Sequence, residues 1–129
     1  MNMKSAISAY TQTKVHSAVD GASPSQLITL LLDGALERVR EARSHMQQGD
    51  LAGQGELIGK AIDIVASLDS YLDHDSGAEV AQSLDSLYDY LVRQLYSANQ
   101  KSDVLILDEV ASLLSEVRVG WVEATKNQE

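Results

Sequence analysis

Residues 28–46 read ITLLLDGALERVREARSHM, and their apolar side chains recur at alternating spacings of four and three. Three later segments repeat this spacing, so each of the four segments presents one apolar stripe when it is helical. An average spacing of about 3.5 residues keeps such a stripe facing neighbouring helices. The four stripes are Ile28, Leu32, Ala35, Val39, Ala42, Met46; Ile58, Ala61, Val65, Leu68, Leu72; Ala81, Leu84, Tyr88, Leu91, Leu95, Ala98; and Leu107, Val110, Leu114, Val117, Trp121, Ala124. The pattern predicts an all-α fold, an antiparallel up-down four-helix bundle.

Capping signals predict where these helices begin and end. Ser23 precedes Pro24, and Gln26 lies three positions after Ser23, which is the pattern of a capping box. Asp50 can cap the second helix, and Ser102 or Asp103 can cap the fourth. We expect the helices to end near Gly49, Leu72, Ala98 and Ala124, with residues 73–77 and 99–102 as connections. Short connections between helices of equal length make neighbours antiparallel.

Composition indicates the class of protein. A chain of 129 residues is ordinarily one domain with a core of its own. The sequence has no cysteine, which excludes disulfides and thiolate chemistry and fits a reducing cytoplasm. The first ten residues, MNMKSAISAY, contain no apolar run typical of a signal peptide, and no stretch approaches the length of a membrane span. We therefore expect a cytoplasmic protein without direct membrane insertion.

The charge balance is strongly acidic. With 10 basic and 19 acidic side chains, the formal charge is -9 at pH 7. Such a surface repels phosphate backbones and anionic lipids, so binding of nucleic acid or membranes is disfavoured.

Residues 1–22 fall outside the four-helix pattern and form an N-terminal arm or capping helix. They are mostly small and polar, with Ile7 and Tyr10 three positions apart. One interpretation is a frayed terminus. The other is a lid whose Ile7 and Tyr10 cover an apolar groove when no partner is bound. We assign residues 23–125 to the bundle and 126–129 to a disordered tail.

The second and third predicted helices each carry an additional apolar stripe. One interpretation is that flanking positions widen the buried face of each helix. The other is that two adjacent stripes form a continuous groove for a partner, because exposed apolar patches mark protein interfaces. The candidate groove residues are Leu57, Ile64 and Tyr71 on the second helix and Val80, Leu87 and Tyr90 on the third.

The sequence does not indicate an enzyme. Di-iron bundles use Glu-x-x-His pairs, and none of His16, His45 or His74 has a Glu three positions before it. Glycine-rich phosphate loops and nucleophile elbows are also missing from the sequence. His74 between two aspartates is typical of a solvated turn, and His45 near a helix end complements the helix dipole. We expect no catalytic residues, no metal and no cofactor.

Several stretches in order resemble the flagellin-specific export chaperone family, FliS. They are AYTQTKV (9–15), ASPSQLITLLLDGAL (22–36), LIGKAIDIVASLDSYL (57–72), SLDSLYDYLVRQLYSANQKSD (83–103) and EVASLLSEVRVGW (109–121). The resemblance covers nearly the whole chain. Where most members of that family carry Tyr before the DGAL stretch, this chain carries Leu32, so a hydroxyl role is absent there.

The resemblance implies a function that the residue patterns alone do not. Members of the family are helical bundles that bind the disordered C-terminal segment of flagellin in the cytoplasm, prevent its premature polymerisation and aid delivery to the flagellar type III export gate. The bound segment wraps the bundle partly as helix, and the arm bearing Tyr10 moves when flagellin binds.

Two alternatives stay open. The additional stripes can bury one another in a homodimeric structural or adaptor bundle, and we expect a monomer or a weak homodimer. Alternatively, a small acidic bundle can be a phosphotransfer domain with His45 or His74 as the acceptor.

Overall fold

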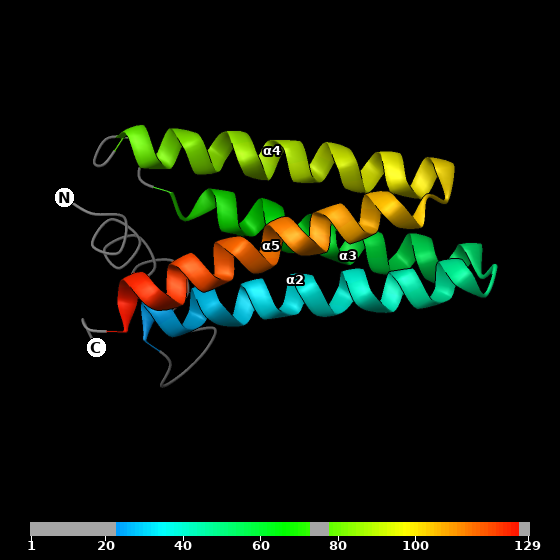
Figure 1. Ribbon diagram of the computed structural model, residues 1–129, viewed down its shortest axis with the longest axis horizontal. Helices are drawn as coiled ribbons and strands as arrows, with labels where there is room; N and C mark the ends of the chain where they lie inside the picture. Colours follow the sequence, from blue (N-terminus) through cyan, green and yellow to red (C-terminus); the bar gives the residue numbers. More distant parts are fainter. Residues whose placement is uncertain (1–22, 73–77, 127–129) are drawn as a thin grey trace.

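The computed structural model describes residues 23–72 and 78–126, and this part of the chain is built from four α-helices (Figure 1). They are α2 (Pro24–Gln47), α3 (Leu51–Ser70), α4 (Ala78–Lys101) and α5 (Val104–Thr125). Helix α2 packs against α3 and α5, and α4 packs against the same two helices. Successive helices run in opposite directions, which confirms the predicted up-down four-helix bundle.

Three predicted sites lie outside the described residues. They are the arm 1–22 with Ile7 and Tyr10, the turn 73–77 with His74, and residues 127–129 of the expected tail 126–129. Among the described residues, none of the helices combines the length and the apolar character that a membrane span needs.

The predicted caps are formed. The Ser23 hydroxyl accepts a hydrogen bond from the Gln26 amide at 3.1 Å, and Gln26 Oε1 accepts one from the Ser23 amide at 2.9 Å. Asp50 caps α3 by accepting from the Gly53 amide at 3.0 Å. Asp103, rather than Ser102, caps α5. Helix α4 continues to Lys101, three residues past its expected end, and is followed by Ser102, whose φ of 49° breaks the helical path.

The four predicted stripes form the core. Those of α2 and α3 are buried throughout, as are most residues of the other two. Leu84 and Val117 are only half-buried. Ala124 is exposed, which corrects its assignment to the core, and Thr125 is buried in its place. An α-helix has about 3.6 residues per turn, so a stripe of shorter period drifts and a later position faces inward near the end.

Two ion pairs join α2 to α5. Arg43 Nε lies 2.6 Å from Asp108 Oδ1, and Arg118 pairs with Asp33. In each pair the hydrogen bond to the carboxylate, followed by its charge, raises the pKa of the arginine. These ion pairs hold α5 against α2. Among the described residues, no ion pair joins α5 to α4.

Candidate functional site

A largely apolar groove lies between α4 and α5. Its volume is about 500 Å³. Helix α4 contributes Glu79, Val80, Ser83, Leu84 and Tyr88; α5 contributes Glu116, Val117, Gly120 and Trp121; and α2 contributes Ile28 and Leu32. We call this hollow the α4–α5 groove.

The groove exists because α4 and α5 diverge along their length. The two helices are adjacent where Lys101 leads into Val104, and they separate toward the beginning of α4 (Figure 1). Leu84 and Val117, the stripe residues that remain half-buried, both line the opening. Gly120 adds no side chain to the hollow, and a Cβ placed there would meet nothing within 4 Å. The groove is therefore a stretch of bundle core that is left open to solvent.

Hydrogen bonds anchor the inner surface of the groove. Trp121 is buried, and its Nε1 donates a hydrogen bond to the Ser25 carbonyl at 3.0 Å. The Thr125 hydroxyl donates to the Trp121 carbonyl at 3.0 Å. Since Ser25 lies in the first turn of α2, these bonds join the beginning of α2 to the end of α5 and fix the indole that lines the groove.

Tyr88 separates the α4–α5 groove from a smaller hollow between α3 and α4. It lines both hollows, and its side chain is almost fully buried. Burial, and next the negative charge of Asp69, raises the pKa of Tyr88 to about 12. The phenol therefore stays neutral at physiological pH and contributes an apolar ring to the base of the groove.

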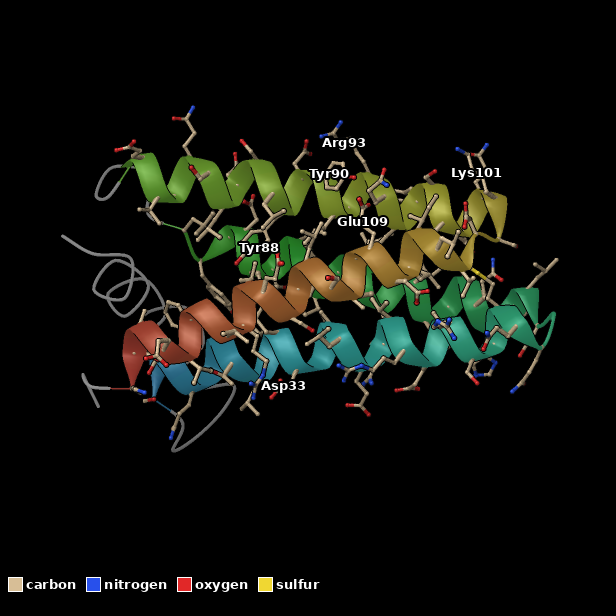
Figure 2. The ribbon with its side chains drawn as sticks, in the orientation of Figure 1. Asp33, Tyr88, Tyr90, Arg93, Lys101 and Glu109 are labelled. Carbon is tan, nitrogen blue, oxygen red and sulfur yellow. The ribbon has the colours of Figure 1, made fainter. Side chains whose placement is uncertain are left out.

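The other half of the α4–α5 junction is closed by polar contacts. The Tyr90 hydroxyl donates to the Glu109 carboxylate, at 2.9 Å to Oε1 and 3.0 Å to Oε2, and Gln94 Nε2 donates to Oε1 at 3.1 Å. Figure 2 shows Tyr90 on α4 facing Glu109 on α5, with Arg93 beside the ring. The hydrogen bond to Glu109 is the main cause that raises the pKa of Tyr90. These contacts mark the boundary beyond which the two helices separate.

A buried amide holds the end of the junction. Gln54 of α3 is almost fully buried, and its Nε2 lies within 3.2 Å of the Asn99 carbonyl, Asn99 Oδ1 and Ser102 Oγ. Its Oε1 is buried without a hydrogen-bond partner among the described residues. Gln54 thereby connects α3 to the turn that joins α4 to α5.

The predicted groove residues lie at two different helix junctions. On α3, Ile64 faces α2, because a Cβ added at Gly34 would lie 3.5 Å from Ile64 Cδ1. Leu57 lies one heptad before Ile64 on α3, and Tyr71, the C-cap residue of α3, lies one heptad after it. On α4, Val80 lines the α4–α5 groove and Tyr90 bonds to α5.

Ile64 and Val80 thus lie beside different neighbouring helices, Ile64 beside α2 and Val80 at the α4–α5 groove. The hollow between α3 and α4 is lined by Val65, Ala66 and Asp69 of α3 and by Asp85, Tyr88, Asp89 and Val92 of α4. Tyr71 is buried, Leu57, Ile64, Leu87 and Tyr90 are half-buried, and Val80 is 49% exposed. The role of these six residues in binding a partner stays a prediction.

The sequence pattern assigned several groove residues to the core. Ile28, Leu32, Val117 and Trp121 all belong to predicted inward stripes, and each also lines the groove. One local feature of the sequence could have indicated the groove. Ser83 and Gly120 are small residues next to stripe positions on the two diverging helices.

Polar chemistry is sparse in the described part of the bundle. Its His, Asp and Glu side chains form no group of three that could hold a metal ion. His45 lies in the last turn of α2, as predicted, and its Nδ1 is 2.8 Å from Asp50 Oδ2. The hydrogen bond from the Gly53 amide, and next the one with His45, lowers the pKa of Asp50. This arrangement caps a helix.

In the described residues, a helical bundle with an apolar groove between two of its helices is typical of a protein-binding module. The sequence matches the family model described as flagellar protein FliS over residues 6–128. The chain therefore belongs to the FliS family, as its sequence motifs indicated.

Curated relatives cover most of the chain. The flagellar secretion chaperone FliS of Vibrio cholerae is 39% identical over 119 residues, which span 92% of this chain and 88% of that protein. The corresponding protein of Salmonella typhimurium is 43% identical over 122 residues, spanning 94% and 90%. Flagellar secretion chaperone FliSB of Pseudomonas aeruginosa is 43% identical over 116 residues, spanning 90% and 92%. These names describe secretion chaperones rather than enzymes.

Proposed function

We propose that this protein is a cytoplasmic export chaperone that binds the disordered C-terminal segment of flagellin. In this role it prevents premature polymerisation and aids delivery of flagellin to the flagellar type III export apparatus. Membership of the FliS family supports the proposal, as do relatives named flagellar secretion chaperones.

The α4–α5 groove is the site at which we propose that flagellin binds. It offers the side chains of a bundle core to an external segment, and Val80 at its edge is exposed. Val80 lines the groove, and we propose that Leu87 and Tyr90 extend this contact surface along α4. The half-buried Leu57 and Ile64 on α3, next to Tyr71, form a second surface for a segment that wraps the bundle.

The mechanism follows from competition for one apolar surface. A disordered segment buries its apolar side chains in the groove as it becomes helical, and those side chains are then withheld from other flagellin molecules. Ordering such a segment costs about 2–5 kcal/mol or more of the gross interaction energy, so the complex stays releasable at the export gate. The binding step requires no nucleotide and no cofactor.

The arm 1–22 is proposed as a lid over this surface. Ile7 and Tyr10 compete with flagellin, and the apparent affinity falls by the fraction of molecules whose groove is open. Replacing both with Ser strengthens flagellin binding if the arm only covers the groove. The same change weakens binding if the arm also contacts flagellin.

Isothermal titration calorimetry tests the proposed function. A synthetic C-terminal segment of the same organism's flagellin is expected to bind one to one, with a large negative heat-capacity change. Gly120→Leu places a side chain in the groove, where a Cβ meets nothing within 4 Å, and is expected to weaken binding at least about tenfold. Gly59→Leu, also in open space but outside the groove, is the control and leaves the affinity unchanged.

Two results would contradict the proposal in different ways. The absence of binding by the folded wild-type protein removes flagellin as the partner. Binding that Gly120→Leu does not affect moves the site away from the groove. Sedimentation over a concentration series tests the accompanying expectation of a monomer or a weak homodimer, and a stable dimer would favour the structural alternative.

A further inference from the structure

Two glutamates stand on opposite sides of the apolar α4–α5 groove. Glu79 comes from the first turn of α4, and Glu116 comes from α5. Both side chains belong to exposed residues, and they are the charged residues that line the groove within the described chain. We call them the rim glutamates.

The rim glutamates differ from the acidic residues elsewhere on α2 and α5. Asp33 and Asp108 each pair with an arginine, and Glu109 accepts hydrogen bonds from Tyr90 and Gln94. Neither Glu79 nor Glu116 has an ion-pair partner among the described residues. Together with the chain's formal charge of -9, this leaves a negative potential at the mouth of an apolar site.

A bound segment must bury apolar side chains in the groove and also compensate the charges of the rim glutamates. An apolar helix laid over the groove removes water from the carboxylates at its edges, and that desolvation is unfavourable unless a positive charge replaces the water. Lysine and arginine suit this position, because their aliphatic stems can cover Val80 while the charged ends reach the carboxylates.

Within the function proposed above, we propose that the groove selects a helical segment whose apolar stripe carries Lys or Arg on both edges. The basic residue on one edge pairs with Glu79, and the one on the other edge pairs with Glu116. A segment with acidic residues at those positions associates more slowly, because like charges then face each other across the interface. The rim glutamates are thus specificity-determining residues for the client.

The effect of exposed charges is expected mainly in the rate of association. Complementary charge steers encounter and is screened by salt, whereas exposed ion pairs add little to final stability. The selectivity should therefore be largest at low ionic strength and should fade as the Debye length falls to about 8 Å near physiological salt.

Two synthetic peptides of about 18 residues, five helical turns, test the rule. They share one Leu/Ile stripe and differ in carrying Lys or Glu along both edges. Stopped-flow measurements at low ionic strength are expected to give the Lys peptide an association rate about tenfold higher. Glu79→Lys/Glu116→Lys is expected to reverse the preference.

Glu37→Lys/Glu56→Lys is the matched control. It changes the net charge by the same amount at exposed positions that do not line the groove, and it keeps the preference for the Lys peptide. Equal rates for the two peptides would overturn the inference. A reversal by the control as well, or binding of the Lys peptide that Gly120→Leu leaves unchanged, would overturn it too.

Parallel titrations with the flagellin segment separate this inference from the proposed function. If flagellin binds in the groove while the two peptides are not discriminated, the rule for the rim is wrong and the chaperone function stands. If the peptides are discriminated and flagellin does not bind, the rule stands for a different client.

Discussion

The two halves of the junction between α4 and α5 share the same apolar spacing but differ in how deeply the apolar side chains are buried. Near the turn that joins the helices, Leu95 and Leu107 are fully buried, and Gln54 holds the turn from α3. In the other half, Leu84 and Val117 occupy equivalent stripe positions and remain half-buried beside an open groove. Equal spacing therefore leads to core in one half and to a candidate binding surface in the other.

The physical difference lies in what holds the helices together. At the closed end, Ser102 and Asp103 connect α4 directly to α5, and Tyr90 bonds to Glu109 further along. At the open end, α4 begins after its connection to α3, and α5 is held to α2 through Trp121 and Ser25. At that end α4 is connected to α3 while α5 is held to α2, and the groove lies between α4 and α5.

Substitution of one leucine from each half of α4 is expected to change the free energy of unfolding by very different amounts. Leu95→Ala removes a fully buried side chain and is expected to lower the free energy of unfolding by about 2–5 kcal/mol. Leu84→Ala removes a half-buried side chain beside an existing hollow and is expected to cost about 1 kcal/mol. Urea unfolding of the two variants measures both values. Equal losses would show that the groove is closed in solution.

Two glycines, one beside each half of the junction, are expected to respond in opposite ways to substitution by alanine. At Gly120, beside the open half, an added Cβ meets nothing within 4 Å, so Gly120→Ala should stabilise the fold by about 0.5–1 kcal/mol through helix propensity. At Gly53, near the closed end, an added Cβ lies 2.5 Å from both Asp50 Oδ2 and His45 Nδ1, so Gly53→Ala should disturb the cap of α3 and destabilise the fold. Melting temperatures are expected to move in opposite directions, and a rise in both would contradict the packing described near the α2–α3 turn.

The same cap gives a dependence on pH. The folded protein holds the pKa of Asp50 below its ordinary value, so this carboxylate stabilises the fold at pH values above the ordinary range, near 4. Its contribution falls as the pH drops through the lowered pKa of the folded state. The melting temperature of the wild type should exceed that of Asp50→Asn at pH 7, and the difference should vanish in strong acid. Asp63→Asn, at an exposed site on α3, is the control, and a difference that grows in acid would refute the assignment.

The smallest expected effect concerns the boundary between the halves. Tyr90→Phe removes the hydroxyl that bonds to Glu109 while keeping the ring. We expect overall stability to change little, because the contact is solvent-exposed. Hydrogen exchange in the first half of α4 is expected to become a few-fold faster, since the groove is then less restrained. Tyr96→Phe, whose ring is exposed on the same helix, should leave exchange unchanged.

Most of the fold could be predicted from the sequence because burial and capping are local signals. The stripe of Ile28 and Leu32, and the capping box of Ser23 and Gln26, depend on spacing within one helix. The prediction failed at Ala124, where a stripe of constant period drifted from the true helical repeat and Thr125 is buried instead.

The candidate groove could not be predicted in the same way. Periodicity shows which side of a helix is apolar, but it does not give the order of helices around the bundle. Ile64 and Val80 were therefore placed in one groove, whereas the structure directs Ile64 toward α2 and Val80 toward α5. The opening at Leu84 and Val117 depends on helix divergence, which involves several distant contacts.

Photo-crosslinking from single cysteines tests whether flagellin binds at the α4–α5 groove, since the chain has no cysteine of its own. A benzophenone label at Val80→Cys, beside the groove, is compared with one at Leu105→Cys, an apolar position that is 72% exposed and does not line the groove. The flagellin segment is expected to crosslink at position 80 and not at position 105. Crosslinking at position 105 with none at position 80 would contradict it.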